Sequence, residues 1–121
     1  MDESYINRCF DLARMGSPKV SPNPMVGAVV VANNRIIGEG FHKAYGQPHA
    51  EVKAVNSIRP EDIHLLSVST IYVSLEPCCI HGKTPPCTNL ILDNKIPRVV
   101  ISSLDRSPEV NGKSLDILRN A

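Results

Sequence analysis

The sequence from Val26 to Phe41 reads VGAVVVANNRIIGEGF. Two apolar runs, residues 26–32 and 35–41, flank the pair Asn33-Asn34, and asparagine tolerates the positive φ angles that two-residue hairpin turns require. The nearly continuous apolar character of the first run is typical of a strand buried on both faces. This stretch therefore predicts an antiparallel hairpin whose first strand is covered on both sides by helices.

The rest of the chain alternates between predicted helices and strands. Residues 3–15 carry apolar side chains at helical spacing, and Cys9 falls on that stripe as a small core residue. A helix starting at His49 presents Val52, Val55 and Ile58 on one apolar face. Strands are expected at 70–75 and 98–102, helices at 87–94 and 113–119, and irregular chain with a short helical start at 60–69. Strands separated by helices imply parallel crossovers, so we expect a three-layer α/β/α sandwich with a mixed sheet of the five-stranded type.

Length and charge limit the functional classes. The 121 residues form one predicted domain, 1–121. Thirteen basic and twelve acidic residues leave a net charge of +1, which favours a small-molecule ligand over nucleic acid. The start of the chain lacks the features of a signal peptide, and the apolar run from Met25 to Ala32 is too short to cross a bilayer. We therefore expect a cytoplasmic protein with no membrane partner.

The cysteines gather in one segment. Residues 76–87 read EPCCIHGKTPPC and hold three of the four cysteines. Cysteines clustered beside a histidine, in a chain without an export signal, favour metal binding over disulfides. His49, Cys78 and Cys87 provide one nitrogen and two sulfurs, a set that leaves a fourth zinc position for water. Cys79 is interpreted as a spare residue behind the site, whereas as a fourth ligand it would make the zinc structural.

A carboxylate accompanies the predicted metal ligands. Glu51 follows His49 by two residues and can share the cavity without binding the metal. There it can accept a proton from water and pass it to a departing amino group, so His-x-Glu with two cysteines indicates a deaminase rather than a protease. Taken singly, these residues have simpler interpretations: a structural histidine, a solvated glutamate and a structural zinc corner. Their combination favours a catalytic zinc.

These residues resemble the diaminohydroxyphosphoribosylaminopyrimidine deaminase family of bacterial riboflavin biosynthesis. The resemblance covers nearly the whole chain, and the eight-residue spacing between Cys78 and Cys87, with Gly-Lys-Thr-Pro-Pro inside it, is highly specific. Cytidine and tRNA adenosine deaminases are similar in fold and in His-Ala-Glu but typically have a short Cys-x-x-Cys. The matching segments are 21–24, 26–27, 38–42, 49–51, 75–78 and 82–87, together with Asp105, Pro108 and Gly112. Cys79 and Ile80 stand where the family usually has Ser then His, and Asp105-Arg106-Ser107-Pro108 replaces the family's Asp-Pro-Asn-Pro.

The resemblance assigns roles to individual residues. It implies a cytidine deaminase-like fold, Zn²⁺ held by His49, Cys78 and Cys87, and proton transfer by Glu51. It also changes the interpretation of Asn23, which by composition alone is part of a stiff turn between two prolines. The implied substrate contacts are Asn23, His42, Ala50 and Lys83, the last as the cation that meets a phosphate.

The resemblance also implies a reaction: hydrolytic deamination of a ribosylated diaminopyrimidinone 5′-phosphate. Deamination of cytidine, deoxycytidylate or a tRNA base is the alternative, and a non-catalytic zinc-stabilised module is an alternative of another class. Most members of the family carry a carboxy-terminal reductase domain that this sequence does not contain, which leaves a stand-alone deaminase or a fragment. A homo-oligomer, dimer or tetramer, is expected.

Overall fold

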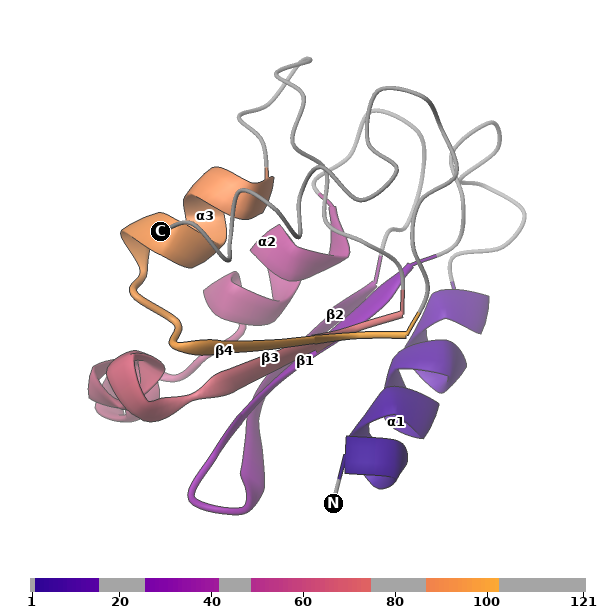
Figure 1. Cartoon of the computed structure of the whole chain (residues 1–121), viewed down its shortest axis with the longest axis horizontal. Helices are drawn as coiled ribbons and strands as arrows, with labels where there is room; N and C mark the ends of the chain where they lie inside the picture. The colour runs from indigo at the N-terminus through magenta and orange to yellow at the C-terminus, as the bar shows by residue number, and fades with distance from the viewer. Residues whose placement is uncertain (1, 16–25, 42–48, 75–86, 103–121) are drawn as a thin grey trace.

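The computed structural model describes residues 2–15, 26–41, 49–74 and 87–102 (Figure 1). In chain order, the elements are α1 (Asp2–Arg14), β1 (Gly27–Ala32), β2 (Arg35–Phe41), α2 (Ala50–Asn56), the 3₁₀ helix η1 (Pro60–Val68), β3 (Thr70–Val73), α3 (Cys87–Asp93) and β4 (Arg98–Ile101). The predicted helix at 113–119 lies outside the described residues.

The sheet is mixed, as predicted. Within the described chain it has four strands in the order β2-β1-β3-β4. Strand β1 is antiparallel to both β2 and β3, whereas β3 and β4 are parallel. The predicted hairpin turn is confirmed, because Asn33 and Asn34 have φ angles of 52° and 62°, the left-handed values of a type I′ turn. A bulge interrupts the β1–β2 ladder between Val30 and Val31.

Helices cover the two faces of the sheet. Helix α1 packs on one face, and α2 and α3 lie on the other (Figure 1). Successive residues of β1 alternate between the two hydrophobic clusters, with Val29 facing α1 and Val30 facing α2. Every residue of β1 is buried, so the sequence prediction of a doubly covered strand is confirmed. The described chain therefore has the three-layer α/β/α architecture.

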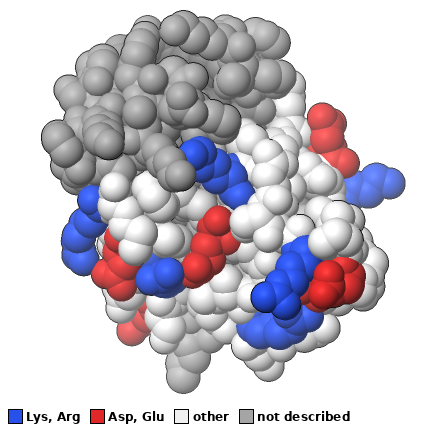
Figure 2. Space-filling view, turned by 180° about the vertical axis from the view of Figure 1, so that it is seen from behind, with Lys and Arg blue, Asp and Glu red and all other residues white. Residues whose placement is uncertain are grey.

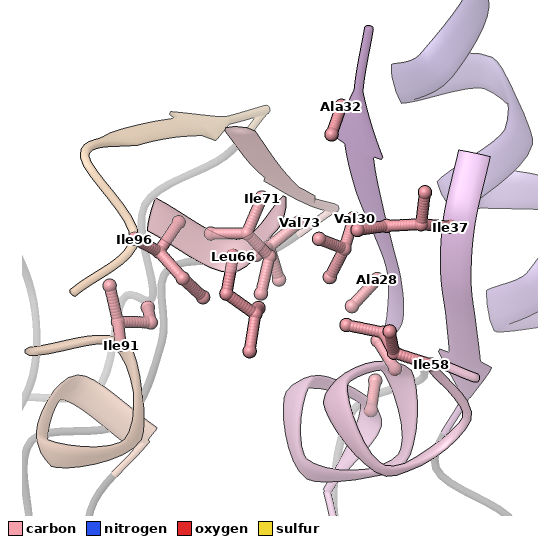
Figure 3. Packing of buried hydrophobic residues seen from close by; sticks show 12 residues of the cluster. Ala28, Val30, Ala32, Ile37, Ile58, Leu66, Ile71, Val73, Ile91 and Ile96 are labelled. Atoms are coloured by element: carbon pink, nitrogen blue, oxygen red, sulfur yellow. The ribbon is translucent and has the colours of Figure 1, made fainter. Parts of the chain in front are cut away.

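The larger hydrophobic cluster lies between the sheet and α2 with α3. In Figure 3, Ala28 and Val30 of β1 lie near Ile37 of β2 and Ile58 after α2, while Ile91 and Ile96 approach from the α3 side. On the opposite face, Cys9 is fully buried in the smaller cluster, which confirms its predicted core position.

Three sequence expectations need correction. The predicted apolar face of the helix at α2 is confirmed at Ile58, which is buried, and at Val55, which packs against the core, but Ala50 and Ala54 are the fully buried residues and Val52 is only partly buried. The small alanines occupy the side nearest the sheet because α2 approaches the strand backbone too closely for valine. Residues 60–68, expected to be irregular after a short helical start, form a continuous 3₁₀ helix with Pro60 in its first turn. In addition, β3 ends at Val73, two residues before the predicted end of the strand.

Among the described helices, none combines the length and apolar character needed to cross a membrane. The 13-residue α1 is the longest of them, and its exposed side carries charged residues.

Candidate functional site

One end of the sheet collects the segments to which the sequence assigns function. Gly27 at the start of β1 pairs with Phe41 at the end of β2. Ala28 pairs with Val73 at the end of β3, and Val73 is itself opposite Ile101 at the end of β4. The segments 16–25, 42–48 and 75–86 therefore all join the sheet at this end. Strand register, rather than sequence proximity, brings together the strand ends to which these three segments attach.

Ser74 fixes this end of the sheet. Its hydroxyl accepts a hydrogen bond of 3.1 Å from the Gly27 backbone N–H, and its own N–H donates to the Gly27 carbonyl at 3.1 Å. The side chain is buried. Ser74 was not among the sequence-predicted site residues, yet its hydrogen bonds to Gly27 anchor the chain just before the cysteine-rich stretch. The feature of the sequence that could have indicated this role is a polar residue directly after a β-branched run.

The first turn of α2 carries the predicted ligand and the predicted proton-transfer residue. His49 is the residue before the helix, with φ −69° and ψ 166°, and its carbonyl accepts the first helical hydrogen bond from Lys53 at 3.1 Å. Its side chain makes no capping bond to the helix, and the residue is partly buried. Glu51 is 3% exposed, and Ala50 between them is fully buried. The burial of Glu51 argues against the interpretation of a solvated helix residue.

The structure describes only part of the predicted site. Cys87 is the first residue of α3, which contacts α2, but its side chain lies outside the description. Asn23, His42, Cys78, Cys79 and Lys83 also lie outside the described residues. Within the described part of the chain, no three His, Cys, Asp or Glu side chains are grouped as a metal site would need. Neither of the predicted cysteine ligands, Cys78 and Cys87, is among those side chains, because the side chains of both lie outside the described part of the chain.

The described backbone places one predicted zinc ligand, His49, and the start of the helix that carries another, Cys87. His49 precedes α2, Cys87 begins α3, and the two helices lie against each other on the same face of the sheet (Figure 1). The stretch that contains Cys78 starts directly after the anchored Ser74. One imidazole and two thiols form a ligand set that zinc accepts at catalytic sites. The buried Glu51 supplies a carboxylate on the same turn as the imidazole.

Charges are distributed without a dominant sign. On the face shown in Figure 2, lysine and arginine alternate with aspartate and glutamate across the described surface. Ion pairs of the described residues include Arg8 with Glu39 at 2.6 Å and Arg35 with Asp62 at 2.6 Å. This mixed surface agrees with the small-ligand interpretation of the composition.

Comparison with known proteins places the chain in a family. Residues 1–103 match the family described as the cytidine and deoxycytidylate deaminase zinc-binding region. The chain is 46% identical over 118 residues to a diaminohydroxyphosphoribosylamino-pyrimidine deaminase of Buchnera aphidicola, covering 98% of this chain and 78% of that protein. The chain belongs to this family of zinc-dependent deaminases. It is an enzyme domain of the riboflavin-biosynthesis type, as the sequence resemblance predicted.

Larger members of the family show the same domain within a longer protein. The riboflavin biosynthesis protein RibD of Bacillus amyloliquefaciens is 46% identical over 121 residues, which are all of this chain and 32% of that protein. A Thermotoga maritima crystal structure, named a deaminase and 5-amino-6-(5-phosphoribosylamino)uracil reductase, is 48% identical with a TM-score of 0.90. The alignment covers 98% of this chain and 33% of that one. The chain thus spans about a third of the length of these two proteins. The high TM-score confirms the predicted three-layer α/β/α fold.

Proposed function

We propose that this domain deaminates 2,5-diamino-6-ribosylamino-4(3H)-pyrimidinone 5′-phosphate to 5-amino-6-ribosylaminouracil 5′-phosphate and ammonia. The observation that carries the proposal is the nearly complete burial of Glu51 on the helical turn that His49 precedes. A carboxylate removed from solvent beside a zinc ligand is suited to transfer protons during hydrolysis. The names of the relatives support the choice of substrate.

His49, Cys78 and Cys87 would hold the zinc ion. When bound, zinc supplies Lewis-acid chemistry that makes water a nucleophile near neutral pH. Glu51 is not a ligand in this assignment. Its carboxylate takes a proton from the attacking water and delivers it to the departing 2-amino group. In the overall reaction a C–O bond forms, a C–N bond breaks, and the amino group leaves as ammonia.

Substrate contacts would come from segments that join the same end of the sheet. Asn23 precedes β1 by a few residues, and His42 directly follows β2. Both would bind the polar edge of the pyrimidine. Ala50 would contribute its position between His49 and Glu51, and Lys83 would meet the phosphate. These four assignments rest on the family resemblance and on the strand ends that lead to the segments.

The test is Glu51→Gln, which preserves shape and removes the ionisable group. Zinc content, measured by atomic absorption, should remain at one ion per chain, while ammonia release from the diaminopyrimidine phosphate should fall by about 10²–10⁴-fold. Glu61→Gln is the matched control, because Glu61 is exposed at the start of η1. It should leave both quantities unchanged.

Two results would contradict the proposal. Undiminished turnover by Glu51→Gln would remove Glu51 from the reaction. A wild-type protein that ignores the diaminopyrimidine but deaminates cytidine or deoxycytidylate would keep the chemistry and change the substrate.

A further inference from the structure

Two glycines in β2 lie directly under α2. Adjacent strand residues point to opposite faces, so Gly38 and Gly40 face α2 while Glu39 faces α1 and pairs with Arg8. A Cβ atom placed on Gly40 would lie 2.6 Å from the Ala50 carbonyl oxygen and 2.6 Å from the Ala54 backbone nitrogen. Strand and helix backbones are therefore in direct contact at Gly40.

The contact at Gly40 cannot be relieved by a side-chain rotation. Two of its three nearest atoms belong to the helix backbone, and the third is the Cβ of Lys53. To regain an ordinary van der Waals separation, this part of α2 would have to move away by about 1 Å. One of the atoms that would have to move is the carbonyl oxygen of Ala50, the residue between His49 and Glu51.

Gly38 makes the same kind of contact one turn further along the helix. A Cβ there would lie 2.3 Å from the Ala54 carbonyl oxygen and 2.7 Å from Cγ1 of Ile58. The last turn of α2 is also fixed by Ser57, whose hydroxyl accepts a hydrogen bond from the Glu39 N–H at 3.0 Å and donates to the Ala54 carbonyl at 2.8 Å. Hydrogen bonds thus tie the far end of α2 to β2, whereas the near end rests on Gly40.

We infer that Gly40 is a positioning residue of the deaminase site: its missing side chain sets the height of His49 and Glu51 above the sheet. The inference rests on the proposed function. Catalytic groups must be held within about 0.5 Å of their productive positions, and a displacement of about 1 Å can reduce turnover by about 10²-fold. The shift that a methyl group at Gly40 requires is of this size.

The decisive comparison is Gly40→Ala against Gly38→Ala. Both variants add one methyl group between the same strand and the same helix, so both should lower Tm. A purely structural role predicts that zinc affinity and turnover change equally in the two variants. The positioning role predicts a difference between them, because a Cβ at Gly40 would meet the Ala50 carbonyl in the turn that carries Glu51, whereas the three atoms nearest a Cβ at Gly38 belong to Ala54, Ser57 and Ile58.

The measurements are Tm, zinc affinity by competition with a chromogenic chelator, and kcat and KM for ammonia release. For Gly40→Ala we expect zinc affinity to fall at least about 10-fold and kcat to fall by about 10²-fold, with KM changed less than kcat. For Gly38→Ala we expect zinc affinity and kcat within about 3-fold of wild type. Equal losses in the two variants, or an unchanged zinc affinity in Gly40→Ala, would overturn the inference.

A second variant approaches the same contact from the helix. Ala54 is fully buried in the cluster between α2 and the sheet, so Ala54→Val should also widen the separation between helix and strand. This variant takes the place of Gly40→Ala in the test if Gly40→Ala does not fold. It should weaken zinc binding in the same direction, and unchanged affinity in this variant would also overturn the inference. The zinc measurement needs no substrate. It therefore still tests Gly40 if the wild-type protein proves inactive on the diaminopyrimidine, a result that would count against the proposed function alone.

Discussion

Arg8 of α1 binds Glu39 of β2 through two hydrogen bonds, Nε to Oε2 at 2.6 Å and a terminal guanidinium nitrogen to Oε1 at 3.2 Å. The pKa of Arg8 is raised above its ordinary value, chiefly by this hydrogen bond and then by the charge of Glu39. Glu39 stands between the two glycines that contact α2. The same three residues of β2 therefore fix helices on both faces of the sheet.

Replacing Arg8 with lysine should weaken this connection. Lysine keeps the charge but cannot form the two-pronged bond, and both side chains are only partly buried, so we expect a loss of about 0.5–1 kcal/mol in the free energy of unfolding. Urea denaturation measures the change. Arg14→Lys is the control, since the Arg14–Asp11 pair is more exposed and should contribute almost nothing. An equal loss of stability in the two variants would show that the two-pronged hydrogen bonding of Arg8 to Glu39 adds no stability of its own.

Replacing His49 with alanine should remove zinc. A catalytic zinc has three protein ligands, and loss of one should lower the bound metal well below one ion per chain, with ammonia release falling in parallel. His64→Ala is the matched control, because His64 is exposed on η1. Atomic absorption after gel filtration reports the metal content. Full zinc occupancy in His49→Ala would exclude His49 as a ligand.

Cys9 should make the folded protein less stable as the pH rises into the alkaline range. Burial raises the pKa of the Cys9 thiol to about 12, while a cysteine in the unfolded chain ionises near 8.5. Because the folded-state pKa of the thiol is raised, its contribution to the free energy of unfolding is fully present below about pH 8.5. This contribution is lost as pH rises towards 12, by about 1.4 kcal/mol per pH unit.

The variants Cys9→Ala and Cys9→Ser should both lose this slope. Serine retains a donor for the Tyr72 carbonyl, which the Cys9 thiol contacts at 3.2 Å, so it separates the hydrogen bond from the ionisation. Urea unfolding at pH 8, 9.5 and 10.5 gives the slopes. The same slope in all three proteins would show that Cys9 is not its source.

Asp62 should make the folded protein less stable as the pH falls into the acidic range. Its pKa lies below the usual value, mainly because the Arg35 guanidinium donates to its carboxylate at 2.6 Å and 3.3 Å. Since the folded-state pKa is depressed, the stabilisation is present above the unfolded pKa of about 3.9 and is lost as pH falls through the folded value. The loss therefore occurs in the range below about pH 4.

Asp62→Asn should be less stable than wild type at pH 7, and the difference should shrink at pH 3. Arg35→Gln should behave in the same way, and the double variant should cost no more than either single one. Thermal unfolding at the two pH values measures this. A difference between Asp62→Asn and wild type that is equally large at both pH values would contradict the assignment.

The local chemistry of the chain was largely readable from the sequence. Asn33-Asn34 specified a turn that needs positive φ, the continuous apolar run after Val26 specified a doubly covered strand, and the helical stripe placed Cys9 in the core. His49-Ala50-Glu51, together with the eight-residue spacing between Cys78 and Cys87, predicted the family. These features follow from conformational preference and ligand chemistry, which act over a few residues.

Only the tertiary structure decided how these features meet. Pairing of β1 with both β2 and β3 places the ends of three strands together, and no local pattern specifies that register. The burial of Ala50 and Ala54 on the inner side of α2 also depends on a partner, because it follows from the close approach of the helix to Gly38 and Gly40. The sequence determined which groups are candidates for the chemistry. Backbone contacts between distant segments determined where α2 lies above the sheet, because the distance between such segments is set by packing and not by local preference.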